Sequence, residues 1–312
     1  MNKLKYSEMF YSLQGEGRYV GVPSLFLRLF GCNFECRGFG QDRDKTKWLD
    51  HDKMPHNQEH SDVKSLVDLP VPHVGCDSSF SWGKKWGHLA KHEDIKTIVK
   101  KMDTVKWLGD KENHSSPTAY QLSPCTLQND AVHLVITGGE PLLKGFQPAL
   151  RELINHPDVF TRFVTFETNG TQIFTPDNSV EYIRKFGVNK NSGVTWSVSP
   201  KLSNSGEKWE ESIRPEALAS YNAWPYSYLY LKFVVRDEDD MKEVHEAVRA
   251  YYHARVNIDA IYLMPETGPP MYDNEGFELK GPSYKVAQLA LKYGYKYSPR
   301  LQINLFGNEW GT

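Results

Sequence analysis

Three cysteines in the first quarter of the chain have the residue type and the grouping of ligands for a metal cluster. Cys32 and Cys36 are separated by three residues, and Cys76 follows after 39 intervening residues, within Cys76-Asp77-Ser78. Proteins hold iron–sulfur clusters through cysteine thiolates, usually four of them. Three thiolates would leave one iron of a four-iron, four-sulfur (4Fe–4S) cluster open for another ligand. The three cysteines therefore predict a cluster with an open position.

Other uses of the four cysteines fit the rest of the sequence less well. Two disulfides would suit a short secreted protein, whereas this chain has 312 residues and shows no apolar signal segment near Met1. A structural zinc site generally takes four ligands in paired short spacings, which a Cys-x3-Cys pair does not match. Cys125 lies far from the other three cysteines, and we interpret it as a lone structural thiol.

A glycine-rich turn supplies a second candidate for ligand binding. Thr137-Gly138-Gly139-Glu140-Pro141 follows an apolar run at Val132–Ile136. Glycines at the end of a strand let the backbone approach a ligand closely, and a glutamate can pair with an ammonium group. By itself the turn could be an ordinary connection between a strand and a helix. Its place after the cysteine motif favours a binding function.

Strands that alternate with helices must position these motifs. Apolar runs with strand character occur at Ser24–Phe30, Val132–Thr137, Phe163–Glu167, Val194–Val198, Tyr228–Val235 and Ile258–Met264. Helical patterns occur at His92–Met102, Gly145–Asn155, Ser179–Phe186, Asp237–Tyr252 and Tyr284–Tyr293, with Asp237 as a candidate N-cap. This alternation predicts a parallel α/β sheet, and about six units predict an incomplete (βα)6 barrel. We expect one domain over residues 1–312.

Two polar stretches interrupt this pattern. Residues 37–75 separate the cluster cysteines and are rich in Asp, Lys, His and Gln, so we interpret them as a surface insertion with a short helix around Asp62–Leu69. Residues 109–130 are predicted to form another loop. The formal net charge of −2 does not indicate the positively charged surface that binds nucleic acid. No apolar run reaches the length of a membrane span. We therefore expect a cytoplasmic protein that binds neither nucleic acid nor membranes directly.

The cysteines and the Gly-Gly-Glu turn together resemble those of the radical S-adenosylmethionine (SAM) enzymes. In that superfamily, SAM chelates the open iron of a 4Fe–4S cluster and is cleaved to a 5′-deoxyadenosyl radical. Further motifs narrow the resemblance to the 7-carboxy-7-deazaguanine synthases. These motifs are Gln14-Gly15-Glu16-Gly17, Phe26-Leu27-Arg28-Leu29, Phe166-Glu167-Thr168-Asn169-Gly170-Thr171, Ser197-Val198-Ser199-Pro200-Lys201, Leu231-Lys232-Phe233-Val234-Val235 and Leu263-Met264-Pro265.

The resemblance implies a carbon–nitrogen lyase of 7-deazapurine biosynthesis. Such an enzyme contracts 6-carboxy-5,6,7,8-tetrahydropterin to 7-carboxy-7-deazaguanine with loss of ammonia, for queuosine or for modified DNA. It regenerates SAM, uses Mg²⁺, receives electrons from a reductase such as flavodoxin or ferredoxin, and forms a homodimer. In this chain the implied cluster ligands are Cys32, Cys36 and Cys76, and the implied Mg²⁺ ligand is Ser78. The implied SAM-binding residues are Gly138, Gly139, Glu140, Thr168, Ser197, Ser199 and Lys201, and the implied pterin-binding residues are Gln14, Glu16 and Arg28.

Three departures from the family pattern bear on these roles. Ser78 stands where relatives commonly carry a threonine, and it keeps the hydroxyl oxygen that Mg²⁺ would bind. Arg300-Leu301-Gln302 stands where some relatives carry a histidine near the substrate, which leaves the role of Gln302 open. The gap of 39 residues before Cys76 is longer than in relatives.

The sequence also leaves simpler interpretations open. Arg28 could form a structural salt bridge, and Glu16 could face solvent. Two other classes of protein remain as alternatives: another radical SAM enzyme such as a glycyl-radical activase, and a non-catalytic interaction scaffold stabilised by zinc or a cluster.

Overall fold

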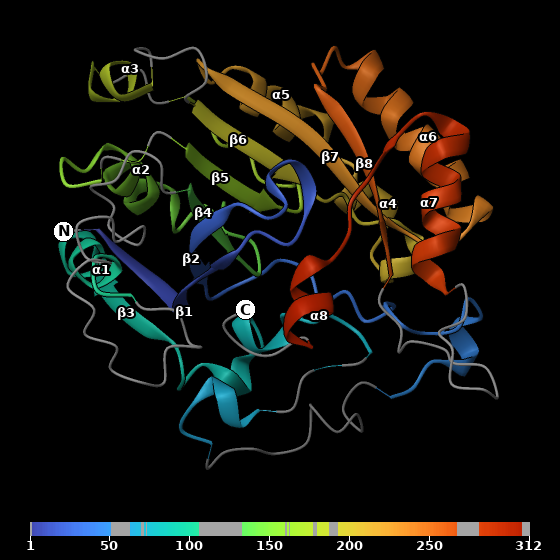
Figure 1. Cartoon of the computed structure of the whole chain (residues 1–312), viewed down its shortest axis with the longest axis horizontal. Helices are drawn as coiled ribbons and strands as arrows, with labels where there is room; N and C mark the ends of the chain where they lie inside the picture. The colour runs from blue at the N-terminus through green and yellow to red at the C-terminus, as the bar shows by residue number, and fades with distance from the viewer. Residues whose placement is uncertain are drawn as a thin grey trace.

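The chain forms a mixed α/β fold around one large sheet (Figure 1). The computed structural model describes residues 2–50, 63–69, 72, 74–105, 133–159, 161, 163–176, 180–186, 193–266 and 281–307. Nine strands lie in the order β3-β1-β2-β4-β5-β6-β7-β8-β9, so β3 and β9 are the edges of an open sheet. Their bounds are β1 Lys3–Leu13, β2 Pro23–Leu29, β3 Lys91–Asp94, β4 His133–Gly138, β5 Phe163–Thr168, β6 Gly193–Val198, β7 Ser227–Val235, β8 Ala260–Pro265 and β9 Lys296–Tyr297.

Most of the sheet is parallel. Strand β2 pairs with β4 in parallel, and parallel pairing continues in order through β9. Strand β1 runs antiparallel to both β2 and β3. The six predicted strands are thus confirmed as β2 and β4–β8, whereas β1, β3 and β9 were not predicted. The parallel order places the carboxyl ends of β2 and β4–β8 along one edge.

The sheet is curved. Most helices lie along its convex, outer face, whereas α8 lies on the concave, inner face (Figure 1). Their bounds are α1 Ile95–Met102, α2 Gln147–Asn155, α3 Val180–Phe186, α4 Trp209–Ser212, α5 Pro215–Asn222, α6 Glu238–His253, α7 Pro282–Tyr293 and α8 Leu301–Phe306. Short 3-10 turns occur at Gly17–Tyr19, Lys45–Lys47, Leu66–Asp68, Ser79–Ser81, Lys84–Trp86 and Ser203–Ser205. Within the described residues, no helix is long and apolar enough to cross a membrane.

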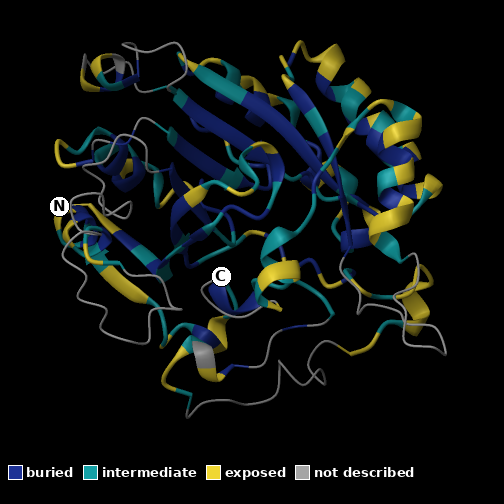
Figure 2. Cartoon of the chain, viewed as in Figure 1, coloured by how far each residue is buried: buried dark blue, intermediate teal, exposed yellow. Residues whose placement is uncertain are grey.

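Alternation along the strands gives the sheet two different faces. On β7, Leu229, Leu231 and Phe233 are fully buried in the main hydrophobic core, together with residues of the outer helices. The intervening Lys232 lines a pocket on the other side. The same alternation recurs on β4 and β5, where Ile136 and Phe166 join the core. Figure 2 shows the buried strands at the centre and the exposed residues along the outer helices.

The predicted helix at His92–Met102 was wrong in its first turn. Lys91–Asp94 is strand β3, which pairs with Lys3–Tyr6 of β1, and the helix begins at Ile95. Asp94 ends the strand and caps the helix, because its carboxylate accepts a hydrogen bond from the Thr97 amide at 2.9 Å. A pairing partner far away in the sequence therefore decided the conformation of these residues.

The remaining predicted helices agree with the structure within a few residues. Asp237 is confirmed as the N-cap of α6, where its carboxylate accepts from the Asp239 amide at 3.0 Å. The short helix predicted around Asp62–Leu69 reduces, in its described part, to a 3-10 turn at Leu66–Asp68. Cys125 and the loop predicted at residues 109–130 lie outside the described residues.

Candidate active site

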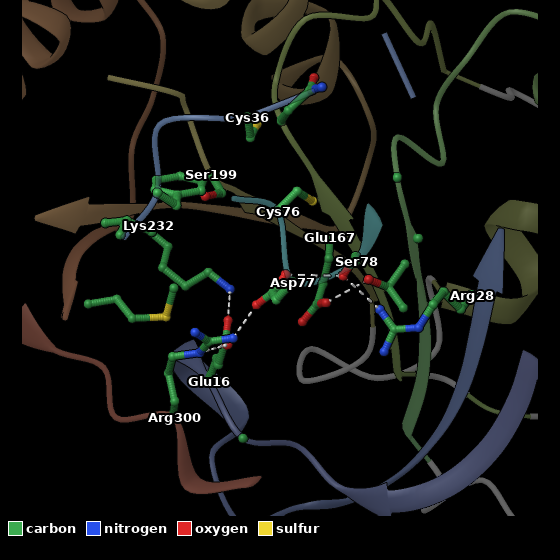
Figure 3. A pocket seen from close by; sticks show the side chains of 18 of the residues that line it. Glu16, Arg28, Cys36, Cys76, Asp77, Ser78, Glu167, Ser199, Lys232 and Arg300 are labelled. Carbon is green, nitrogen blue, oxygen red and sulfur yellow. Dashed lines mark hydrogen bonds and ion pairs between the residues drawn. The ribbon is translucent and has the colours of Figure 1, made fainter. Parts of the chain in front are cut away.

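A pocket opens at the carboxyl ends of the parallel strands and brings the sequence motifs together (Figure 3). Motif residues from Gln14 to Pro265 line it, although β1 and β8 lie near opposite edges of the sheet. Of the predicted site residues, all except Glu140 line this pocket: Gln14, Glu16, Arg28, Cys32, Cys36, Cys76, Ser78, Gly138, Gly139, Thr168, Ser197, Ser199 and Lys201.

The three cysteines are free thiols along this pocket, although 39 residues separate the second from the third. The insertion begins and ends close together, since the Gly75 amide donates to the Phe39 carbonyl at 2.7 Å. Two thiols also accept hydrogen bonds, Cys32 from the Phe34 amide and Cys76 from the Trp82 indole, each at 3.4 Å. Contacts of this kind would stabilise a thiolate.

Burial dominates the protonation of these thiols. It raises the pKa of Cys32 to about 12, although the Phe34 amide works in the opposite direction. It also raises the pKa values of Cys36 and Cys76. Burial therefore favours the protonated form of all three thiols at neutral pH.

The loop that carries Cys36 is held from behind by one carboxylate. Cys36 has a left-handed backbone conformation with φ of 49°, which is unusual for a residue other than glycine. Glu207 Oε1 accepts from the amides of Cys36 and Glu35 at 2.6 and 3.0 Å. The Gly38 amide adds a hydrogen bond to the Ser205 carbonyl at 2.9 Å. The turn after β6 thus fixes the loop between the two nearby cysteines.

The Gly-Gly-Glu turn packs directly against the first cysteine. A methyl group on Gly139 would lie 2.3 Å from the Gly31 carbonyl oxygen and 2.7 Å from Cys32 Cβ, so only glycine fits there. The Glu140 amide donates to the same Gly31 carbonyl at 2.7 Å. This turn and the first cysteine loop therefore form one unit.

Glu140 lies behind the pocket wall instead of lining it. Its buried carboxylate accepts from the Thr168 hydroxyl at 2.8 Å and from the amides of Leu142 and Asn169 at 2.8 and 2.7 Å. Burial raises the pKa of Glu140 to about 7, against the opposing effect of these hydrogen bonds. The side chain holds Thr168 and Asn169 at the pocket wall.

Gln14 and Glu16 come from the turn after β1 and are engaged within the protein. Gln14 Nε2 donates to Glu167 at 3.1 Å, and its Oε1 accepts from the Glu16 amide at 3.1 Å. The Glu16 carboxylate pairs with Lys232 and accepts from Arg300 Nε at 3.3 Å. The alternative that Glu16 faces solvent is excluded, because its side chain is only 15% exposed.

Electrostatics keep Glu16 ionised despite its burial. Burial by itself would raise the pKa of this carboxyl group, but the positive charges of Lys232 and Arg300 outweigh it and lower the pKa to about 2. The Lys232 pKa is raised by Glu16 and Glu167, against the effect of its own burial. The pair is therefore charged at neutral pH.

Arg28 lies on the opposite side of the pocket (Figure 3). Its Nε donates to Glu8 at 2.7 Å, so the structural salt bridge that the sequence left open is present. Its Nη1 donates to the Ser78 hydroxyl at 3.3 Å, and Ser78 in turn donates to Asp77 at 3.2 Å. The guanidinium group is therefore directed at the third cysteine loop.

Several charged residues of the pocket were missed by the sequence analysis, which assigned no role to Asp77, Glu167, Lys232 or Arg300. Glu167 accepts from Gln14 and from the Thr137 hydroxyl, the latter at 2.8 Å. Glu167 and Lys232 stand among apolar residues in β5 and β7, and a charge at such a position is the signal that could have found them. Nothing in the local sequence identifies Arg300, because the two carboxylates it contacts, Glu16 and Asp77, lie more than 200 residues earlier.

Fold and site together define an α/β protein with a cysteine-lined pocket at the carboxyl ends of a mostly parallel sheet. The chain is 27% identical over 317 residues to the 7-carboxy-7-deazaguanine synthase of Pyrobaculum aerophilum, which covers 99% of this chain and 97% of that relative. It is 26% identical over 322 residues to the synthase of the same name from Halobacterium salinarum, with 98% and 91% covered. The predicted resemblance to 7-carboxy-7-deazaguanine synthases is thereby confirmed along nearly the whole chain.

The chain was also compared with solved structures and with protein-family models. The crystal structure of QueE from Escherichia coli aligns with a TM-score of 0.45 at 18% identity and covers 95% of this chain and 93% of its own. No family model matches the chain.

Proposed function

We propose that this protein is a radical SAM enzyme that converts 6-carboxy-5,6,7,8-tetrahydropterin to 7-carboxy-7-deazaguanine with release of ammonia. The observation that carries the proposal is the convergence, in one pocket, of three free cysteines with Gln14 and Arg28. The similarity to synthases of that name over 99% of the chain supports it.

Cys32, Cys36 and Cys76 would hold a 4Fe–4S cluster. Within the described residues, no three His, Cys, Asp or Glu side chains are placed to hold a single metal ion. A cluster makes a different demand, because each thiolate binds a different iron. The donor set fits this demand, since all three thiols line one pocket and two of them accept N–H hydrogen bonds. When bound, the cluster would supply the electron that cleaves SAM to start radical chemistry.

The SAM side of the pocket would be formed by the ends of β4, β5 and β6. Gly138 and Gly139 offer backbone that a ligand can approach, and Thr168, Ser197, Ser199 and Lys201 offer polar groups. Lys201 Nζ lies 3.3 Å from Ser199 Oγ, which places an ammonium group beside a hydroxyl that could receive a ribose or carboxylate. Glu140 would act from behind by fixing Thr168.

The pterin side would be formed by Gln14, Glu16 and Arg28. A pterin edge presents donors and an acceptor that amide and carboxylate groups match. Arg28 uses Nε for Glu8 and directs Nη1 into the pocket, where a substrate carboxylate could bind. Glu16 and Lys232 are held rigidly by their mutual ion pair, so this side is preorganised.

Ser78 would contribute a hydroxyl ligand to Mg²⁺. Hard oxygen ligands and retained waters suit this ion, and the neighbouring Asp77 carboxylate adds negative charge. We predict that Ser78→Ala weakens the stimulation of turnover by Mg²⁺ and lowers kcat by about tenfold at limiting Mg²⁺. Titration of activity with MgCl₂ measures this effect, with Ser65→Ala as the control, because it removes an exposed serine hydroxyl from the insertion. Unchanged magnesium dependence would remove Ser78 from the ligands.

Further features of the proposal rest on the resemblance and on chemistry. We propose that the strands β2 and β4–β8 form an incomplete barrel, in a single domain over residues 1–312 with an insertion at 37–75. A one-electron reductase such as flavodoxin or ferredoxin would reduce the cluster. The homodimer and the cytoplasmic location are proposed from the family and from the free thiols, which suit a reducing compartment.

Anaerobic turnover after reconstitution with iron and sulfide tests the function. The expected result is conversion of the pterin to 7-carboxy-7-deazaguanine with SAM regenerated, measured by mass spectrometry. Formation of 5′-deoxyadenosine in equal amount with product would refute catalytic use of SAM. A reconstituted protein that cleaves SAM but leaves the pterin intact would instead support another radical SAM activity. Absence of a visible absorbance band that bleaches with dithionite would favour the non-catalytic scaffold.

A further inference from the structure

A continuous chain of polar contacts joins residues that line the pocket (Figure 3). It runs from Lys232 through Glu16 to Arg300, then through Asp77 and Ser78 to Arg28. Its members come from five separate regions of the sequence. Arg300 is the link in the middle, where it contacts a carboxylate on each side.

The guanidinium group of Arg300 joins the two halves of the proposed site. Its Nε donates to Glu16 at 3.3 Å, and its Nη2 donates to Asp77. Only 12% of the Arg300 side chain and 15% of the Glu16 side chain are exposed, whereas the Asp77 side chain is 45% exposed. The contact with Glu16 is therefore the better shielded from water of the two. A planar guanidinium group can hold two carboxylates at fixed angles, which a single ammonium group cannot do.

The backbone around Arg300 is tied to the same place. The Leu301 amide donates to the Gly15 carbonyl at 3.0 Å, so the segment entering α8 is attached to the turn that carries Gln14 and Glu16. The contacts of Arg300 are therefore part of a docked segment rather than of a freely rotating side chain.

Gln302 provides a natural comparison within the same segment. Its Nε2 donates to Glu16 at 3.1 Å, as Arg300 does. The described contacts of Gln302 include none to Asp77 or Ser78. Loss of Gln302 therefore weakens the support of Glu16 alone, whereas loss of Arg300 affects both sides.

We infer that Arg300 is a positioning residue that couples the pterin side of the pocket, through Glu16, to the magnesium side, through Asp77 and Ser78. The inference rests on the proposed function. Without Arg300, two acidic groups would face each other across the pocket without the shared cation, and they would move apart. The position of the Ser78 side chain would then no longer depend on the position of the Glu16 side chain.

The test is anaerobic equilibrium dialysis of 6-carboxy-5,6,7,8-tetrahydropterin with the reconstituted, SAM-loaded protein, with and without MgCl₂. Wild type should bind the pterin more tightly in the presence of Mg²⁺. Arg300→Gln should weaken pterin binding about tenfold or more and lose the tightening by Mg²⁺. Gln302→Ala should weaken pterin binding by a smaller factor and keep the wild-type ratio between the two conditions.

The variants are first compared by circular dichroism and urea unfolding. If Arg300→Gln does not fold, Arg300→Lys takes its place, because it keeps the charge and should show both effects at smaller size. If Mg²⁺ tightens pterin binding by the same factor in the Arg300 variant and in Gln302→Ala, the inference is overturned while the proposed function stays intact. Wild-type protein that fails to bind the pterin would overturn the proposed function, and the inference with it.

Discussion

At the scale of residues, the cysteine loops depend on close backbone contacts that only certain side chains permit. Gly139 is pressed against Gly31 and Cys32, and Glu207 holds the amide of Cys36. None of these supports touches a substrate directly in the proposed mechanism. They matter because a cluster needs its thiolates held in a fixed arrangement.

Replacing Gly139 with alanine should destabilise the protein. The added methyl group would collide with backbone and with Cys32 Cβ, so we expect a loss of about 1–3 kcal/mol in the free energy of unfolding and less iron per chain. Urea unfolding and iron analysis measure the two effects. Gly145→Ala is the control, because nothing lies within 4 Å of a methyl group there. Equal behaviour of the two variants would contradict the role assigned to Gly139.

Replacing Glu207 with alanine should loosen the loop of Cys36. Two amide hydrogen bonds to a carboxylate are lost, which costs about 1.5–3 kcal/mol in the free energy of unfolding, and iron bound after reconstitution should fall. Glu211→Ala removes an exposed carboxylate from the same region, paired only with Lys208 at 3.0 Å in the described contacts, and serves as the control. Wild-type iron content in the Glu207 variant would show that the loop holds its shape without this support.

At the scale of elements, two of the described helices begin where a polar side chain accepts a hydrogen bond from an amide of the first turn. Asp94 and Asp237 do this for α1 and α6. Asp237 also pairs with Arg43 of the insertion, so the residues after Cys36 are attached to the start of α6. The described part of the insertion is thus attached to helix α6 through this ion pair.

Two substitutions separate the cap from the ion pair at Asp237. Asp237→Ala should lower the free energy of unfolding by about 1 kcal/mol, because the Asp239 amide loses its acceptor. Asp237→Asn keeps an oxygen for the cap and loses only a half-exposed ion pair, so its stability should stay within about 0.5 kcal/mol of wild type. Urea unfolding distinguishes them. Equal destabilisation by both changes would assign the effect to Arg43.

At the scale of the whole molecule, the inner face of the sheet contains a buried polar layer below the pocket. His133 lies between the hydroxyls of Ser24 and Thr165, at 3.2 and 2.7 Å. Burial lowers the pKa of this histidine from 6.5 to about 3. The folded protein therefore keeps His133 neutral, whereas the unfolded chain protonates it below pH 6.5.

This difference predicts that acid destabilises the fold through His133. Between pH 6.5 and about 3, His133 is protonated in the unfolded chain but not in the folded protein. As the pH falls through this range, the contribution of His133 to the free energy of unfolding decreases by up to about 1.4 kcal/mol for each pH unit. Urea unfolding of wild type and His133→Gln at several pH values measures the contribution as the difference between the two curves. Parallel curves over this range would show that His133 does not titrate in this way.

The sequence by itself determined the class of fold. Apolar runs and helical spacing identified β2 and β4–β8, because periodicity acts over short distances. Residue chemistry pointed to the three cysteines and the Gly-Gly-Glu turn, whereas the other candidate site residues were implied by the resemblance to the synthases. That resemblance came from local motifs.

Only the tertiary structure decided which groups meet. It converted His92–Asp94 to a strand by pairing it with β1, moved Glu140 behind the wall, and brought Arg300 between Glu16 and Asp77. These outcomes depend on contacts between residues far apart in the chain, and their energies are set by burial and by neighbouring charge. No local pattern encodes either quantity, which is why the charged chain across the pocket became visible only in the folded protein.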